Sequence, residues 1–151
     1  MFFRVVIVCI ILAAGYAGYE IVSTWRFYNH IRNPESAFTI KNDGNQTDLT
    51  IVEFLNFACI NCRETHRVLV EYAGKNPTVR YVVRPVPFAN NYAEEAAEIA
   101  LAAGLQGKFW EFDEAIAAYE GTPDQTFYRE TAALYDVDYA RMMKDTKEKQ
   151  V

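Results

Sequence analysis

Apolar residues follow one another almost without interruption in two short stretches of the chain, residues 49–57 and 79–86. A nearly continuous apolar run of this length is typical of a strand that is buried on both faces of a sheet. Pro85 and Pro87 end the second run, because proline cannot donate to a sheet ladder. A third, shorter strand is expected over residues 37–41, where apolar and polar residues alternate.

Between the two long strands the apolar spacing changes to that of a helix, over residues 63–72. Strand, helix and strand in this order form a βαβ unit, which implies two parallel strands joined by a right-handed crossover. The remainder of the chain has helical spacing. Helices are expected over residues 92–105, 109–119, 123–135 and 139–147.

The N-terminal segment, residues 1–22, is a separate apolar stretch with one early positive charge, Arg4. A spanning helix needs about 20 mostly apolar residues and a signal-peptide core about 7–15. The uncharged run over residues 5–19 lies between these lengths. We therefore expect residues 1–22 to be a signal peptide or an N-terminal membrane anchor, with a linker over 23–35.

Features of residues 1–22 and of Trp25 support both a signal peptide and a membrane anchor. Gly15-Tyr16-Ala17 places small residues at the spacing that a signal peptidase reads, whereas Tyr19 and Trp25 suit the interfacial belt of an anchor. A buried core helix is the alternative. Arg4 favours an N-terminus in the cytoplasm and export of the rest of the chain, to a compartment where disulfides persist.

Composition narrows the class of protein further. The chain has 151 residues, 51% of them hydrophobic, which is enough for one domain with a core. Its net charge of −5 comes without a basic patch, so we expect no binding of nucleic acid. The high apolar fraction also argues against a disordered chain.

The candidate chemistry lies at Cys59-Ile60-Asn61-Cys62, between the first long strand and the helix that follows it. A thiol at a helix N-terminus meets unpaired N–H groups and the positive end of the helix dipole, which favour thiolate over thiol. Two cysteines at this spacing can close a small ring and pass a disulfide to another molecule. A structural staple is the alternative, although so small a ring constrains the chain very little.

A metal site is a second alternative for the cysteine pair. His66 lies one helical turn after Cys62, so Cys59, Cys62 and His66 could form half of a zinc site. The sequence offers no good fourth ligand, and we expect His66 to be an ordinary residue of a helix face. Cys62-Arg63 excludes the CxxCH attachment motif of a haem.

Several segments around the cysteine pair resemble those of DsbA-like thiol:disulfide oxidoreductases of the thioredoxin superfamily. The resemblance implies an α/β, thioredoxin-like fold with an inserted helical domain, in which residues 36–88 form the N-terminal βαβ part and residues 89–151 the helical insertion. The matching segments are residues 51–55, the CxxC motif, Arg84-Pro85-Val86-Pro87, residues 96–103, Gln106-Gly107-Lys108-Phe109-Trp110-Glu111-Phe112 and residues 138–142.

The resemblance also implies roles for three residues. Cys59 would be the nucleophile, Cys62 the resolving thiol, and Glu53 a buried carboxylate that relays protons for Cys62. An ion pair of Glu53 with Arg63 or Arg84 is the alternative role. The implied protein is periplasmic in a bacterium, needs no cofactor or metal, acts on client protein thiols and has a quinone-linked membrane thiol oxidase as its redox partner.

Two departures from the family pattern modify this expectation. Strongly oxidising members carry a histidine between the cysteines, whereas Asn61 never carries a positive charge, so we expect a weaker oxidant. The chain also stops at Val151, without the family's cis-proline segment, β-hairpin and last helix. We therefore expect a C-terminally truncated fold with residues 49–55 as an exposed sheet edge. A non-catalytic, membrane-tethered remnant or binding module is the alternative function.

Overall fold

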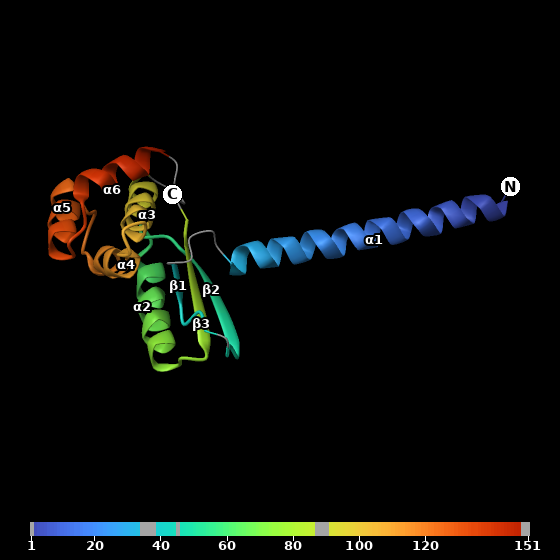
Figure 1. Cartoon of the computed structure of the whole chain (residues 1–151), viewed down its shortest axis with the longest axis horizontal. Coiled ribbons are helices and arrows are strands. Elements are labelled where there is room, and N and C mark those ends of the chain that lie inside the picture. The colour runs from blue at the N-terminus through green and yellow to red at the C-terminus, as the bar shows by residue number, and fades with distance from the viewer. Residues whose placement is uncertain (1, 34–38, 45, 87–90, 149–151) are drawn as a thin grey trace. The chain divides into compact units, whose positions relative to one another are not determined.

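The computed structural model describes residues 2–33, 39–44, 46–86 and 91–148 (Figure 1). The chain divides into two compact units, Met1–Asn33 and Pro34–Val151. The first unit consists of one helix, α1 (Phe2–Arg32), which continues through most of the stretch expected as a linker. The basic side chains His30 and Arg32 lie in its last turn, where they complement the negative end of the helix dipole.

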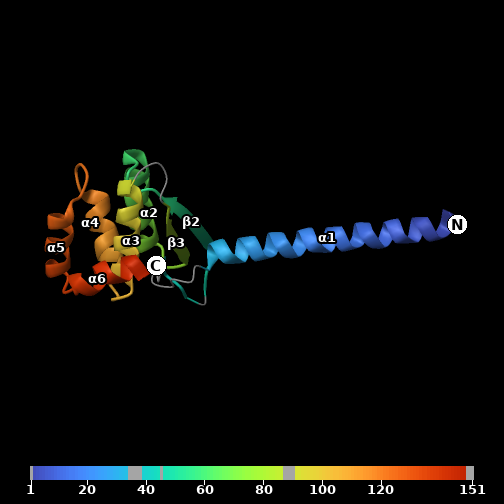
Figure 2. The ribbon, with the colours of Figure 1, turned by 90° about the horizontal axis from the view of Figure 1, so that it is seen from above.

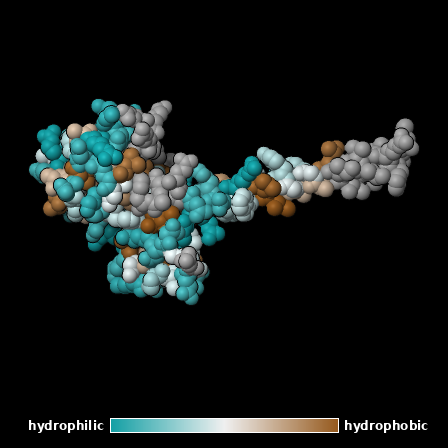
Figure 3. Space-filling model, viewed as in Figure 1, coloured by the Kyte–Doolittle hydropathy of each residue, from teal (hydrophilic) through white to brown (hydrophobic). Residues whose placement is uncertain are grey.

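The described side chains of α1 include many large apolar ones that are exposed, such as Leu12, Ile21 and Trp25. Figure 3 shows hydrophobic residues in brown on the surface of this helix. No helix within the described residues is both long enough and apolar enough to cross a membrane.

A three-stranded sheet organises the described part of the second unit. Its strands are β1 (Ile40–Lys41), β2 (Leu49–Leu55) and β3 (Val79–Pro85), in the order β1-β3-β2. Strands β2 and β3 are parallel, with Glu53 opposite Val83, which confirms the expected βαβ unit. Strand β1 is antiparallel to β3 and shorter than expected; residues 37 and 38 lie outside the described residues.

The two long strands differ in burial. Residues 79–83 of β3, the central strand, are all buried. On β2 the prediction that both faces are buried is wrong, because Leu49 is 48% exposed and Phe54 is 52% exposed. Strand β2 lies at an edge of the three-stranded sheet and so has neighbours on fewer sides.

Helices pack against the sheet and against one another (Figure 2). Helix α2 (Ile60–Lys75) connects β2 to β3 and contacts both strands. Helices α3 (Asn91–Gly104) and α4 (Phe109–Ala118) contact each other, because small residues such as Ala96, Ala100 and Ala103 let the two helices approach. The described chain continues with α5 (Gln125–Leu134), α6 (Tyr139–Asp145) and the 3₁₀ turn Thr146–Glu148.

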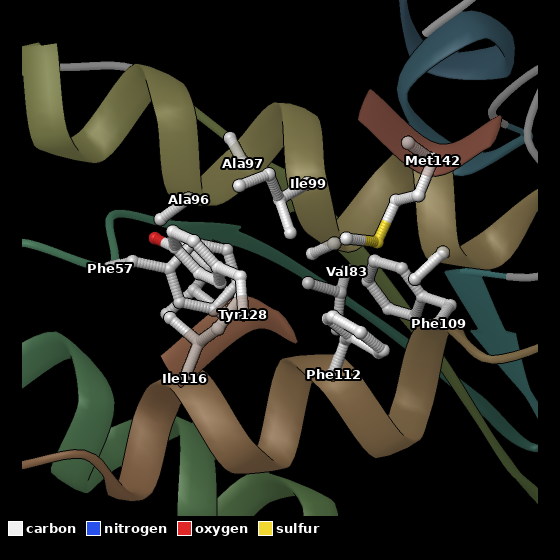
Figure 4. Packing of buried hydrophobic residues seen from close by; sticks show 14 of the residues in the cluster. Phe57, Val83, Ala96, Ala97, Ile99, Phe109, Phe112, Ile116, Tyr128 and Met142 are labelled. Atoms are coloured by element: carbon white, nitrogen blue, oxygen red, sulfur yellow. The ribbon is translucent and has the colours of Figure 1, made fainter. Parts of the chain in front are cut away.

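One hydrophobic core joins the sheet to the helices (Figure 4). Phe109 and Phe112 of α4 are buried in it, as their helical spacing predicts. Both long strands, the loop residue Phe57 and five helices contribute to this core, so the α/β class expected from the sequence is confirmed. Other fully buried members are Phe57, Val83, Ile99, Ile116, Tyr128 and Met142.

Candidate redox site

The cysteine pair begins in a tight turn after strand β2. The side-chain oxygen of Asn56 accepts from the backbone N–H of Ala58 at 2.9 Å, and its carbonyl accepts from the N–H of Cys59 at 3.1 Å. Cys59 then caps α2. Its Sγ accepts a hydrogen bond from the backbone N–H of Cys62 at 3.2 Å, and its backbone carbonyl accepts one from the backbone N–H of Arg63 at 3.0 Å.

Cys59 and Cys62 form a disulfide, with 5.1 Å between their Cα atoms. The residues between them face solvent, since Ile60 is 65% exposed and Asn61 is exposed. Both cysteines are partly buried, and Cys62 packs against the hydrophobic core. The structure therefore places a disulfide at a helix N-terminus, next to exposed residues, where another molecule's thiol can approach it.

Glu53 lies in a cluster of buried polar side chains. Its Oε2 is 2.7 Å from Nδ1 of His66, and it also accepts a hydrogen bond from the hydroxyl of Tyr81. On the other side of the ring, Nε2 of His66 lies 2.7 Å from Oδ2 of Asp113. These contacts join β2, β3, α2 and α4, and they give Glu53 a histidine as its ion-pair partner.

Burial and hydrogen bonding act in opposite directions on His66. Burial lowers the pKa of its imidazole, but the hydrogen bonds to Asp113 and Glu53 outweigh that effect and raise the pKa to about 9. The raised pKa favours the protonated ring, in which Nδ1 donates to Glu53 and Nε2 donates to Asp113. Burial raises the pKa of Asp113 and of Tyr81, and the hydrogen bond to Glu53 raises that of Tyr81 further.

The expectation for His66 is wrong. It is 1% exposed and paired with two carboxylates, so it is not an ordinary residue of a helix face. Asp113 is also 1% exposed, and it is not among the site residues predicted from the sequence. A signal for it exists in the sequence, because Asp113 lies four residues after Phe109 and three before Ile116, on the apolar stripe of α4. A charge on such a stripe indicates a buried partner.

Metal binding is the alternative use of Cys59, Cys62 and His66. Across the described residues, no group of three or more His, Cys, Asp or Glu side chains is arranged to hold a metal ion. The two cysteine sulfurs are bonded to each other, and both nitrogens of the His66 ring contact carboxylates.

Comparison with solved structures places this architecture among thioredoxin-like proteins. A thioredoxin-like oxidoreductase from Silicibacter pomeroyi is 28% identical, with a TM-score of 0.64 over 76% of this chain and 69% of that one. The thiol-disulfide exchange protein α-DsbA2 of Wolbachia pipientis is 18% identical, with a TM-score of 0.70 over 83% of this chain and 67% of that one.

In sequence, part of the chain matches a small part of a curated protein of another name. A Na⁺/H⁺ antiporter, NhaA 1 of Salinispora arenicola, is 34% identical over 95 residues, which are 62% of this chain and 13% of the antiporter. The chain thus spans only a small part of the curated relatives that it matches. A thioredoxin family model matches residues 44–151. The chain therefore belongs to the thioredoxin family and has the fold of DsbA-like proteins.

Proposed function

We propose that this protein is an exported thiol:disulfide oxidoreductase that oxidises client protein thiols with its Cys59–Cys62 disulfide. The observation that carries the proposal is the position of the disulfide, since Cys59 is the N-cap of α2 and its Sγ accepts a backbone N–H. A thiolate on Cys59 would receive a stronger, charge-assisted hydrogen bond there, so reduction of the disulfide is favoured.

The reaction proceeds in two exchanges. A client thiolate attacks Sγ of Cys59; the client–Cys59 bond forms, the Cys59–Cys62 bond breaks, and the electron pair leaves on Sγ of Cys62, which takes up a proton. The client's second thiolate then attacks the client sulfur of the mixed disulfide and releases Cys59 as a thiolate. The client loses two electrons, and the protein gains them as a dithiol.

Glu53 has the role of a proton-relaying carboxylate in this scheme. Its side chain is 10% exposed and contacts His66. His66 in turn lies one helical turn after Cys62, on the same face of α2. A quinone-linked membrane thiol oxidase would restore the disulfide by accepting the two electrons of the dithiol.

Three cysteine variants of the full chain test the exchange reaction. The oxidised wild-type protein is expected to form one disulfide per molecule in a peptide with two thiols, measured by loss of free thiol. Cys59→Ser is expected to form none. Cys62→Ser is expected to hold an oxidised client peptide as a mixed disulfide through Cys59, and Cys9→Ser is the control that behaves as wild type.

A non-catalytic binding module is the alternative function. Absence of exchange by the wild-type protein, together with unchanged behaviour of Cys59→Ser, would establish that alternative and refute the oxidoreductase. Alkylation separates the two as well. In the reduced oxidoreductase, Cys59 is expected to react with iodoacetamide at mildly acidic pH, ahead of Cys62.

Export is the second part of the proposal. Residues 1–22 would direct the chain across the bacterial inner membrane and leave the cysteine pair in the periplasm, either cleaved or as a tether. The early Arg4 and the use of a disulfide support this location. Cell fractionation tests it, because deletion of residues 2–22 should keep the protein in the cytoplasm with Cys59 and Cys62 reduced.

A further inference from the structure

A chain of short contacts leads from strand β2 into the interior. Glu53 contacts Nδ1 of His66 at 2.7 Å, and Nε2 of His66 contacts Asp113 at 2.7 Å. The hydroxyl of Tyr81 donates to Glu53 and lies 3.0 Å from Nδ1 of His66. Each of these four side chains is at least nine-tenths buried, and each holds a hydrogen bond within the cluster. Packing and hydrogen bonds together therefore fix the arrangement.

The far end of this chain reaches a cavity. His66 and Asp113 both line a space of about 460 Å³ that Lys41, Trp110 and Glu114 also border. Oδ1 of Asp113 is buried and has no hydrogen-bond partner among the described residues. A buried carboxylate oxygen without a partner is costly. Because His66 and Asp113 both line the cavity, protons from solvent can enter the cluster there.

Helix α2 connects the other end of this chain of contacts to the redox pair. Cys62 precedes His66 by four residues in α2, so the two side chains share one face of the helix. Cys62 also packs against the core cluster that contains Tyr81. The sulfur that leaves when the disulfide opens is therefore the one nearer to the buried cluster along α2.

We propose that His66 stores the proton that Cys62 needs when the disulfide opens, and that Asp113 is the positioning residue that keeps His66 charged. This proposal rests on the exchange reaction proposed above. When Cys62 leaves as a thiolate, the Nδ1 proton of His66 passes through the Glu53 carboxylate to sulfur. Cys62 becomes a thiol, His66 a neutral ring, and a proton from solvent in the cavity restores the imidazolium.

Other charges around the cluster bear on the titration of His66. Groups from four elements contact His66 or line the same cavity, and they carry both signs, so the cluster is not simply a negative pocket. They are Glu53 of β2, Tyr81 of β3, Lys41 of β1, and Asp113, Glu111 and Glu114 of α4. On α2 itself, Arg67 and Glu71 line the cavity, as does Tyr135 at the end of α5.

The test measures the rate at which dithiothreitol reduces the disulfide of the oxidised full chain, over a range of pH. Each rate is divided by the fraction of dithiothreitol that is thiolate at that pH, which is known. The wild-type rate is expected to fall as His66 loses its proton, at the pH where nuclear magnetic resonance shows its imidazole titrating. His66→Gln is expected to react about tenfold more slowly at neutral pH and to lack this fall.

A matched pair of variants in α4 separates a proton store from a merely structural cluster. Asp113→Asn removes the charge beside Nε2, so the His66 titration and the fall in rate are both expected to move to lower pH, by about one unit. Glu114→Gln, exposed at the same cavity, is expected to change neither. Circular dichroism melts identify variants that do not fold.

Two outcomes would overturn the proposal: a fall in rate that persists in His66→Gln, or one that stays in place while the titration of His66 moves in Asp113→Asn. Dithiothreitol needs no client protein, so this test is independent of the proposed function. A wild-type protein that oxidises no client thiols would refute that function while the proton store is still measured.

Discussion

Oδ2 of Asp113 lies 2.7 Å from Nε2 of His66, so the histidine one helical turn after the cysteine pair forms a buried ion pair with helix α4. Both side chains are nearly inaccessible to solvent. An interaction that requires a protonated ring makes the stability of the protein depend on pH, and the sign of that dependence follows from the raised pKa of His66.

The first prediction concerns this pH dependence. The pKa of His66 is raised from 6.5 to about 9 in the folded protein. Its contribution is therefore fully present below about pH 6.5 and is lost as the pH rises through about 9. We expect a loss of roughly 3 kcal/mol in the free energy of unfolding over that window, measured by urea denaturation. In His66→Gln this loss should disappear; an equal loss in that variant would contradict the assignment.

The second prediction compares two buried tyrosines. The hydroxyl of Tyr128 is buried and has no hydrogen-bond partner in the described structure, whereas that of Tyr81 donates to Glu53. Tyr128→Phe removes an unsatisfied polar group and is expected to stabilise the protein by about 1 kcal/mol. Tyr81→Phe is expected to destabilise it by about 1–3 kcal/mol. Thermal unfolding of both variants measures the difference, and shifts of the same sign would be inconsistent with it.

The third prediction concerns the residues between the cysteines. Asn61 is exposed and close to Cys59, and it carries no charge. Asn61→His places a group there that can become positive, which stabilises the Cys59 thiolate and makes the protein a stronger oxidant. We expect the equilibrium with glutathione to shift about tenfold toward the dithiol, or about 30 mV. Asn61→Gln, which stays neutral, is the control, and an equal shift in it would exclude charge as the cause.

The fourth prediction concerns the edge of the sheet. In the described part of the chain β2 is an edge strand, and Phe54 on it is 52% exposed. An apolar edge strand promotes pairing between molecules, and a lysine on it opposes such pairing. Phe54→Lys is therefore expected to lower aggregation at high concentration, measured by light scattering.

Leu134 of α5 provides the control for that experiment, since it is 74% exposed but lies on a helix. Leu134→Lys removes an exposed apolar side chain of similar kind without changing the strand. If Leu134→Lys lowers aggregation as much as Phe54→Lys does, general surface hydrophobicity is responsible and the sheet edge is not.

Much of the fold can be predicted from local sequence pattern. The apolar runs predict the bounds of β2 and β3 to within a few residues. The change from continuous apolar runs to helical spacing predicts α2 and the helices after it. The βαβ order predicts the parallel pairing, because a crossover helix leaves few other topologies. The position of Cys59 at the start of α2 follows from the same boundary.

The buried cluster could not be predicted in the same way. Helical spacing shows that His66 shares a face with Cys62, but not that Asp113, 47 residues further on, lies against that face. Such a partnership depends on how α4 packs, which periodicity does not specify. The apolar run of β2 alone could not predict the exposure of Phe54 either, since such a run does not distinguish a central strand from an edge strand. The expectation of residues 49–55 as a sheet edge comes from the family resemblance, and β2 is an edge strand in the described sheet.

Because Cys59 is the N-cap of α2, the atom that would exchange disulfides is also the atom that satisfies the backbone N–H of Cys62. A disulfide sulfur, a mixed disulfide and a thiolate accept that hydrogen bond with different strength. Every redox state of the protein should therefore give the Cys62 amide its own chemical shift and hydrogen-exchange rate. One backbone amide would report the complete reaction cycle without any label on the client.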